Sequence, residues 1–157
     1  MLILKTESQI MKSFKQFLLE SEQYNDLKQN AKKMNLSDFL TRYSVEKDNI
    51  RNQDHLPPHH YFNISNIDPS EHDSWDKPDL SSSMEKQVEQ NRNNIKQGKT
   101  SPSILIKGRP DDSKWNPQVI DGHQRVIAAY REGIKKVPGW FDDTTLKEIH
   151  KYANTKT

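Results

Sequence analysis

The residues best suited to chemistry form one polar turn, Asp121-Gly122-His123-Gln124-Arg125, directly after the apolar pair Val119-Ile120. Glycine permits a sharp reversal after a buried strand, and the residues behind it favour a helix that starts at once. The first N–H groups of a helix have no intrahelical partner and lie at the positive end of its dipole, so anions bind there. Arg125, one turn into the helix, can direct its guanidinium at the same anion. The spacing therefore predicts a phosphate-binding turn.

Asp121 ends the predicted strand, so its carboxylate faces the mouth of this site and could hold a metal or a hydroxyl group. A structural interpretation is equally compatible with the spacing. In that interpretation Asp121 and His123 only cap the helix, and Arg125 is a surface residue, because strand–turn–helix junctions are common.

Short strands and helices are predicted around the turn. Asp68-Pro69 ends the first strand, one of the serines near residue 81 starts a helix that ends at Gly98, and Gly133 ends the helix that begins at the motif. The predicted strands cover residues 61–67, 103–107, 118–120 and 137–141, and the predicted helices cover 81–97, 124–132 and 144–152. This order favours a mixed α/β (α+β) domain with a short mixed sheet and flanking helices.

Residues 1–55 are predicted to form an N-terminal helical arm and linker, and residues 56–157 the domain. Apolar residues at helical spacing predict one helix at about 7–20 and a second from Leu36 to Tyr43, with Asn35 as its N-cap. Residues 21–33 are polar and lack a clear apolar stripe. Because both stripes are short, we expect the residues before about Leu56 to pack loosely.

The composition allows one modest core. Only 31% of the 157 residues are hydrophobic, and the mean hydropathy is −1.05. The absence of cysteine excludes disulfides, zinc–thiolate sites and thiol catalysis, and it fits a reducing cytosol. No apolar run approaches the ~20 residues needed to cross a bilayer, so no membrane partner is expected.

Charge is distributed unevenly along the chain. From Arg92 to Lys136 there are ten Lys/Arg against four Asp/Glu, a balance of +6. From Ile64 to Asn91 there are seven Asp/Glu against two Lys, a balance of −5. Such a pair of segments suits a site with phosphate on one wall and a general base or metal on the other, although solvated surface would show the same pattern.

The motif and the residues C-terminal to it resemble a known superfamily. Gly122-x-x-Arg125 at a strand-to-helix turn, then Ala128-Ala129, Gly133 and Val137-Pro138, resembles the second box of the ParB N-terminal domain, in the ParB/sulfiredoxin-like superfamily. The resemblance extends upstream to the strand that ends at residues 67–69 and covers about half the chain. It implies a small ParB/sulfiredoxin-like domain.

Three branches of this superfamily differ at the turn. Sulfiredoxin has a cysteine where this chain has His123, so that activity is excluded. Partition ParB proteins add a second nucleotide box and a helix-turn-helix domain, and we expect no DNA-sliding clamp because the chain stops soon after Phe141. Free serine kinases carry Asp-Gly-His-x-Arg, which Asp121, Gly122, His123 and Arg125 match, and a glutamate after the first strand, for which Glu71 is the candidate.

The resemblance implies a ParB-like nucleotide-binding domain that handles phosphoryl groups, as a kinase or nucleotide hydrolase. The implied phosphate-binding residues are Gly122, His123, Gln124 and Arg125, and the implied catalytic residues are Glu71, Asp121 and His123. The implied ligand is ATP, ADP or CTP, with or without Mg²⁺. The alternative is a ParB-like protein, non-catalytic or of nuclease type, that binds DNA or a host protein.

A second resemblance lies near the N-terminus. Residues 11–20 resemble the leaders of proteins packaged in tailed-phage heads, which are cleaved after a Leu/Ile-x-Glu triplet such as Leu18-Leu19-Glu20. It implies a phage-encoded protein that acts in the host cytoplasm, or one packaged in the virion.

Three other patterns are weaker. Gly98-Lys99-Thr100 is similar to the end of a Walker A loop, but Asn93 stands where that loop needs glycine. His55, His59, His60 and His72 lie in a loop with no rigid element to fix metal geometry, so no metal site is predicted. The tryptophans Trp75, Trp115 and Trp140 could stack on bases, but core packing suits them better.

Overall fold

The computed structural model describes residues 24–45, 58–69, 74–98, 104–110 and 116–155. Together they form a mixed α+β fold, which confirms the fold class expected from the sequence. Besides helical residues 24–33, the elements are α2 (Leu36–Tyr43), β1 (His60–Asn63), the 3-10 helix η2 (Ile64–Asn66), α3 (Ser82–Lys96), β2 (Ile104–Lys107), β3 (Gln118–Asp121), α4 (His123–Arg131), β4 (Lys136–Phe141) and α5 (Asp143–Asn154).

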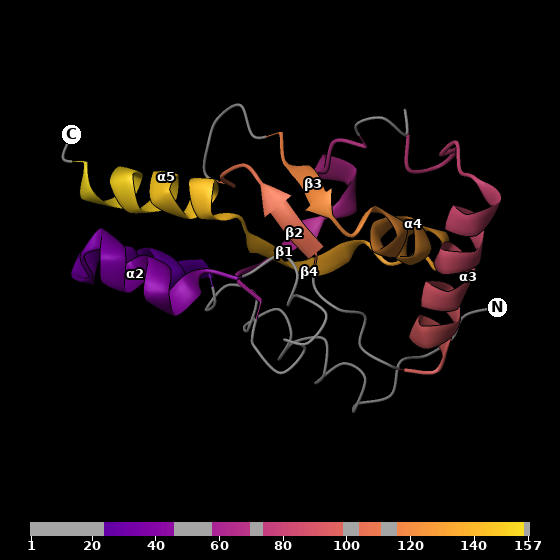
Figure 1. The fold of residues 1–157 in the computed structure, drawn as a ribbon, viewed down its shortest axis with the longest axis horizontal. Coiled ribbons are helices and arrows are strands. Elements are labelled where there is room, and N and C mark those ends of the chain that lie inside the picture. Colours follow the sequence, from indigo (N-terminus) through magenta and orange to yellow (C-terminus); the bar gives the residue numbers. More distant parts are fainter. Residues whose placement is uncertain (1–23, 46–57, 70–73, 99–103, 111–115, 156–157) are drawn as a thin grey trace, which may run out of the picture.

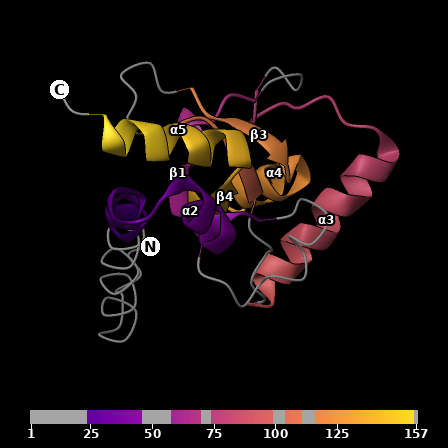
Figure 2. The same ribbon diagram turned by 60° about the vertical axis from the view of Figure 1, so that its left-hand side comes forward.

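The sheet has four strands in the order β1-β4-β2-β3. Its central pair, β2 and β4, is parallel, and each outer pair is antiparallel. The helices gather at the two ends of the sheet, with α2 and α5 together at one end and α3 and α4 at the other (Figures 1 and 2). The β3–α4 turn therefore lies beside α3.

The helix starts follow the sequence signals. The side chains of Asn35, Ser81 and Asp142 accept hydrogen bonds from backbone N–H groups three residues ahead, at 2.9, 3.3 and 3.0 Å. Each cap satisfies a donor that a helix leaves without an intrahelical partner. The structure thus confirms the second predicted helix, the helix that a serine starts, and a terminal helix.

Both faces of the sheet are covered. Ile104 and Ile106 of β2 belong to the main core, whereas Leu105 between them packs with Trp140 on the other face. Trp140 and Trp75 are both buried, and the Trp75 indole N–H donates to the carbonyl of Ile67 at 2.9 Å. Core packing is therefore confirmed for these two tryptophans, whereas Trp115 lies outside the described residues.

The first strand is shorter than the predicted 61–67. It ends at Asn63, and the chain continues as the 3-10 turn η2. Ile64 and Ile67 are both buried, although three residues apart they would face opposite sides of a strand. A 3-10 turn, with three residues per turn, brings both into the core.

The expectation of loose packing before Leu56 is wrong for residues 24–43. Tyr24, Leu27 and Ala31 lie on one face of the helical segment 24–33 and are buried with Phe39 in the main core. Hydrogen bonds tie this part to α5: the His150 ring Nε2 bonds to the Met34 carbonyl at 2.9 Å.

The helix predicted at 7–20 and the cleavage triplet at 18–20 lie outside the described residues. Within the described part, no helix is long and apolar enough to span a membrane.

Candidate functional site

The predicted turn has the expected backbone. β3 ends at Asp121, Gly122 adopts a left-handed conformation with φ 111°, and α4 begins at His123. The Gly122 carbonyl accepts the N–H groups of Arg125 and Val126 at 3.0 and 3.1 Å. Gly122, the N-cap of α4, offers no side-chain cap, so nothing from the cap covers the start of the helix.

Gly122 is required for two reasons. Its φ is one that L side chains rarely adopt. A Cβ at this position would also lie 2.7 Å from Ile104 Cγ2 and 3.3 Å from Arg125 Nη1. The second distance shows that the guanidinium of Arg125 lies directly over the turn.

Arg125 is only 8% exposed, so the interpretation as a surface residue is wrong. Arginine stays charged in proteins, and a charge removed from water interacts more strongly with an ion of opposite sign. A buried guanidinium beside the positive end of a helix is thus well placed to bind an anion.

A cavity of about 270 Å³ opens at this point. Its residues come from two walls, the turn and one face of α3. It is lined by Asp121, Gly122, Gln124 and Arg125 on the first wall, and by Gln87, Gln90, Asn91 and Asn94 on the second. The structure therefore brings together four of the predicted site residues.

The other two predicted site residues are placed differently. His123, the first residue of α4, is half-buried and is absent from the cavity lining. Glu71 lies outside the described residues. Among the described residues that line the cavity, Asp121 has the only carboxylate, so it is the candidate base that the geometry supports.

One ion pair joins the acidic and basic segments that were expected to form opposite walls, and a second lies within the basic segment. Arg131 of α4 makes two hydrogen bonds to the Glu85 carboxylate of α3, at 3.0 and 3.1 Å. Arg92 of α3 donates to Glu132 at 2.7 Å. The hydrogen bond from Arg131 lowers the pKa of Glu85, and that from Arg92 lowers the pKa of Glu132. Both pairs link α3 to α4, and the pair of Arg131 with Glu85 neutralises one of the positive charges counted for the basic segment.

Two of the four histidines considered for a metal site, His59 and His60, stack against Phe141. His59 is buried, and its Nδ1 accepts the backbone N–H of Phe141 at 3.0 Å. Burial lowers the pKa of His59 to about 3. Burial, and then the charges of Lys136 and Lys28, lower the pKa of His60 to about 4. Both rings are therefore neutral near pH 7. Within the described part, no group of three or more His, Cys, Asp or Glu could hold a metal, and His55 and His72 lie outside that part.

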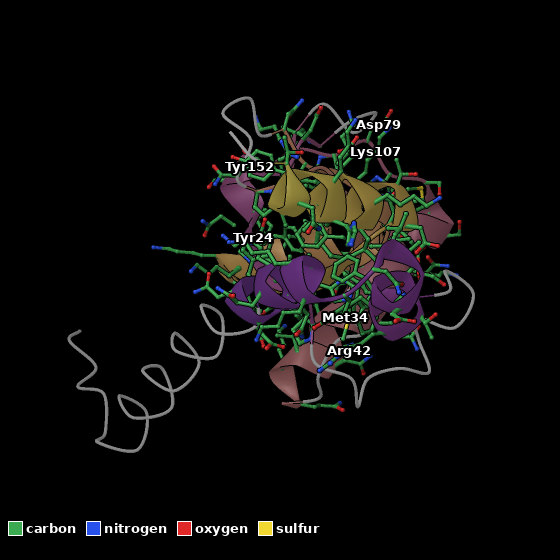
Figure 3. The ribbon with its side chains drawn as sticks, turned by 90° about the vertical axis from the view of Figure 1, so that its left-hand side faces the viewer. Tyr24, Met34, Arg42, Asp79, Lys107 and Tyr152 are labelled. Carbon is green, nitrogen blue, oxygen red and sulfur yellow. The ribbon has the colours of Figure 1, made fainter. Side chains whose placement is uncertain are left out.

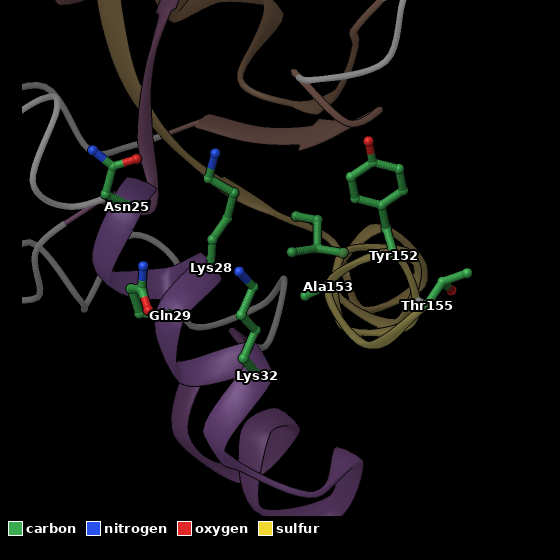
Figure 4. Close-up of a pocket in the computed structure, with 8 residues that line it drawn as sticks. Asn25, Lys28, Gln29, Lys32, Tyr152, Ala153 and Thr155 are labelled. Carbon is green, nitrogen blue, oxygen red and sulfur yellow. The ribbon is translucent and has the colours of Figure 1, made fainter. Parts of the chain in front are cut away.

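A larger cavity, about 470 Å³, lies between helical residues 24–33 and α5 and contains none of the motif residues. Lys28 and Lys32 extend from one wall, and Tyr152 stands on the other (Figure 4). The guanidinium carbon of Arg109 lies 4.2 Å from the centre of the Tyr152 ring. Viewed from this end, α5 lies directly over the N-terminal helices, with Tyr24 and Tyr152 toward the same side (Figure 3). We call this cavity the basic groove.

The α3 wall and the basic groove were both missed from the sequence. Gln87, Gln90, Asn91 and Asn94 follow the i, i+3, i+4, i+7 spacing of one helix face, a pattern visible in the sequence. The pattern indicates a binding surface only once α3 is known to lie opposite the β3–α4 turn. The basic groove depends on segment 24–33 packing against α5, which no local pattern predicts.

No protein-family model matches the chain, and a search of curated proteins gives no match. Among solved structures, the chain is similar to the C-terminally truncated chromosome-partitioning protein ParB from Caulobacter crescentus complexed with CTP-γ-S. That match has 23% identity and a TM-score of 0.37, and covers 62% of this chain and 53% of that one. The same protein complexed to the centromeric parS site matches with 25% identity and a TM-score of 0.35, over 60% and 46% of the two chains. The match thus spans about half of each ParB chain, and at these TM-scores it carries no inference about what this chain binds.

Proposed function

We propose that this chain is a ParB/sulfiredoxin-like nucleotide-binding protein that handles phosphoryl groups, as a kinase or a nucleotide hydrolase. One observation carries the proposal. The buried guanidinium of Arg125 lies over the left-handed turn at Gly122, where α4 begins at the wall of a cavity. The start of α4 offers backbone N–H donors and the guanidinium of Arg125 adds positive charge beside them. The phosphates of ATP, ADP or CTP require both.

Phosphoryl transfer depends mainly on positioning and charge neutralisation, so few residues suffice. In the proposed mechanism Arg125 and the first N–H groups of α4, including that of Gln124, hold the phosphates. Asp121, across the same cavity, accepts the proton of an attacking hydroxyl or water. His123, at the first position of the helix, stays a proposed phosphate ligand on the strength of the motif, although it does not line the cavity, and Glu71 is the second candidate base.

Asp121 also suits Mg²⁺, which proteins bind through one or two carboxylates together with substrate phosphates. The ion would neutralise charge on the transferred group. With Asp121 engaged in this way, the proton-accepting role would fall to Glu71.

The test is calorimetric titration of the chain with ATP, ADP and CTP, with and without Mg²⁺. Arg125→Ala should weaken binding by about 1.5–3 kcal/mol, the range for a charge-assisted hydrogen bond, or roughly 10- to 150-fold. Arg42→Ala is the matched control, since Arg42 is exposed on α2 at the other end of the sheet. Wild-type protein that binds none of the three nucleotides, or an Arg125→Ala variant that binds like wild type, would refute the proposal.

The basic groove favours a second candidate, binding of nucleic acid without turnover. Its lining has two lysines and no carboxylate among the residues described, and Tyr152 presents an aromatic ring at its edge. In this case single-stranded DNA should bind with a steep salt dependence. Lys28→Ala with Lys32→Ala should reduce the slope of log K against log salt by about 1.4, or ~0.7 per lost phosphate contact. A slope unchanged in the double variant would exclude the groove as the binding surface.

A further inference from the structure

Two faces of helix α3 carry polar residues of different kinds. Glu85 and Arg92 face α4, where they pair with Arg131 and Glu132. The other face carries only uncharged amides toward the cavity, and we call these four residues the amide wall: Gln87, Gln90, Asn91 and Asn94. Asn91 and Asn94 are half-buried, whereas Gln87 and Gln90 are exposed.

The amide wall and the turn offer different chemistry. A phosphate accepts hydrogen bonds and attracts cations, which the turn supplies through Arg125 and the start of α4. An amide carries a donor and an acceptor side by side and has no charge. Asn and Gln therefore pair with neutral groups that also place a donor beside an acceptor, as the edge of adenine does in bidentate pairing.

We infer that the amide wall binds the base of a mononucleotide whose phosphates lie at the β3–α4 turn, and that it makes the site prefer nucleotides to phosphate alone. This inference rests on the proposed function. The cavity volume of about 270 Å³ lies just below the range of roughly 300–1,000 Å³ for small-molecule pockets, which favours a single nucleotide over a polymer. The amide wall thus supplies selectivity, and the turn supplies charge-dependent affinity.

The experiment compares nucleoside triphosphates (ATP, CTP and GTP) with inorganic triphosphate, by calorimetry. In Asn91→Leu, affinity for the preferred nucleotide should fall about tenfold, within the range for loss of one bidentate amide–base pair. Affinity for inorganic triphosphate should stay within about twofold, because Leu has the same number and branching of side-chain heavy atoms as Asn and the substitution leaves the turn intact. Arg125→Ala should weaken both ligands. Asn94→Leu repeats the test if Asn91→Leu does not fold.

The matched control is Asn93→Leu, the same substitution on an exposed position of α3 outside the cavity lining. Equal losses for nucleotide and inorganic triphosphate in Asn91→Leu, or no loss for either, would overturn the inference. If wild type binds inorganic triphosphate as tightly as any nucleotide, the inference fails although phosphate binding at the turn survives. If wild type binds neither ligand, the proposed function and this inference fail together.

Discussion

Replacing Gly122 with alanine tests the central geometric feature of the site. A side chain at φ 111° costs about 1–2 kcal/mol in backbone strain alone. The new Cβ would also meet Ile104 Cγ2 at 2.7 Å, and overpacking of this kind costs about 1–3 kcal/mol. Gly122→Ala should therefore lower the free energy of unfolding by roughly 2–5 kcal/mol, a large share of the ~5–15 kcal/mol of an ordinary domain.

Gly133→Ala is the internal control. Gly133 also has a positive φ, 76°, but no atom lies within 4 Å of a Cβ built there. Its replacement should cost only the strain, about 1–2 kcal/mol. Urea unfolding followed by circular dichroism measures both variants, and equal losses would refute the close approach of Ile104 to the turn.

A double-mutant cycle separates the two costs at Gly122. Ile104→Ala removes Cγ2, the atom closest to the new Cβ, but keeps the Ile104 Cβ at 3.1 Å. The pair of substitutions should therefore lose roughly 0.5–3 kcal/mol less than the sum of the single losses. The larger Gly122→Val should also weaken nucleotide binding at least as much as Arg125→Ala, because it blocks approach of an anion to the backbone. Additive losses in the cycle would show that strain, not contact, dominates.

The remaining predictions concern other parts of the chain. Phe39→Ala should lower the free energy of unfolding by about 3–5 kcal/mol, since Phe39 is fully buried; a loss below about 1 kcal/mol in urea unfolding would mean that α2 packs loosely. The pKa values of His59 and His60 are near 6.5 in the unfolded chain and about 3 and about 4 in the folded one, so only the unfolded chain takes up these protons as pH falls from 6.5 toward 4. In that window each histidine should lower the free energy of unfolding by up to about 1.4 kcal/mol per pH unit. A flat profile from pH 7 to 5 would contradict this. With Mg²⁺ held by Asp121 and Glu71 as the base, Glu71→Gln should keep nucleotide binding and lose turnover, measured as phosphate release. If residues 18–20 are a cleavage signal, mass spectrometry of virions should find a chain that begins at Ser21.

Much of the domain could be predicted because local signals and tertiary packing agree. Ser81 and Gly133 mark a helix start and a helix end that the structure confirms within a residue or two. The helical segment 24–33 could not be predicted in the same way. Its buried face consists of Tyr24, Leu27 and Ala31, and neither tyrosine nor alanine marks a core face clearly in a polar stretch.

For the candidate site, the turn at residues 121–125 could be predicted from the sequence, whereas the wall that α3 forms opposite it could not. The order of residues 121–125 determines the strand, the glycine reversal and the helix start. Charge counts along the chain ignore which groups meet, so they could not show that Glu85 pairs with Arg131 across two helices. The amide wall also depends on how α3 packs beside the turn, to which both the buried Val88 and the ion pairs contribute.

The contact between the N-terminal helices and α5 has a consequence for synthesis. Asn154 donates to the Ala31 carbonyl across 123 residues, and His150 bonds to Met34 across 116. At 5–20 residues per second, a ribosome needs roughly 6–25 s to make that intervening chain. Throughout that time the apolar faces of residues 24–43 lack the helix that covers them. The nascent chain therefore exposes these apolar faces to aggregation and chaperone binding until α5 emerges.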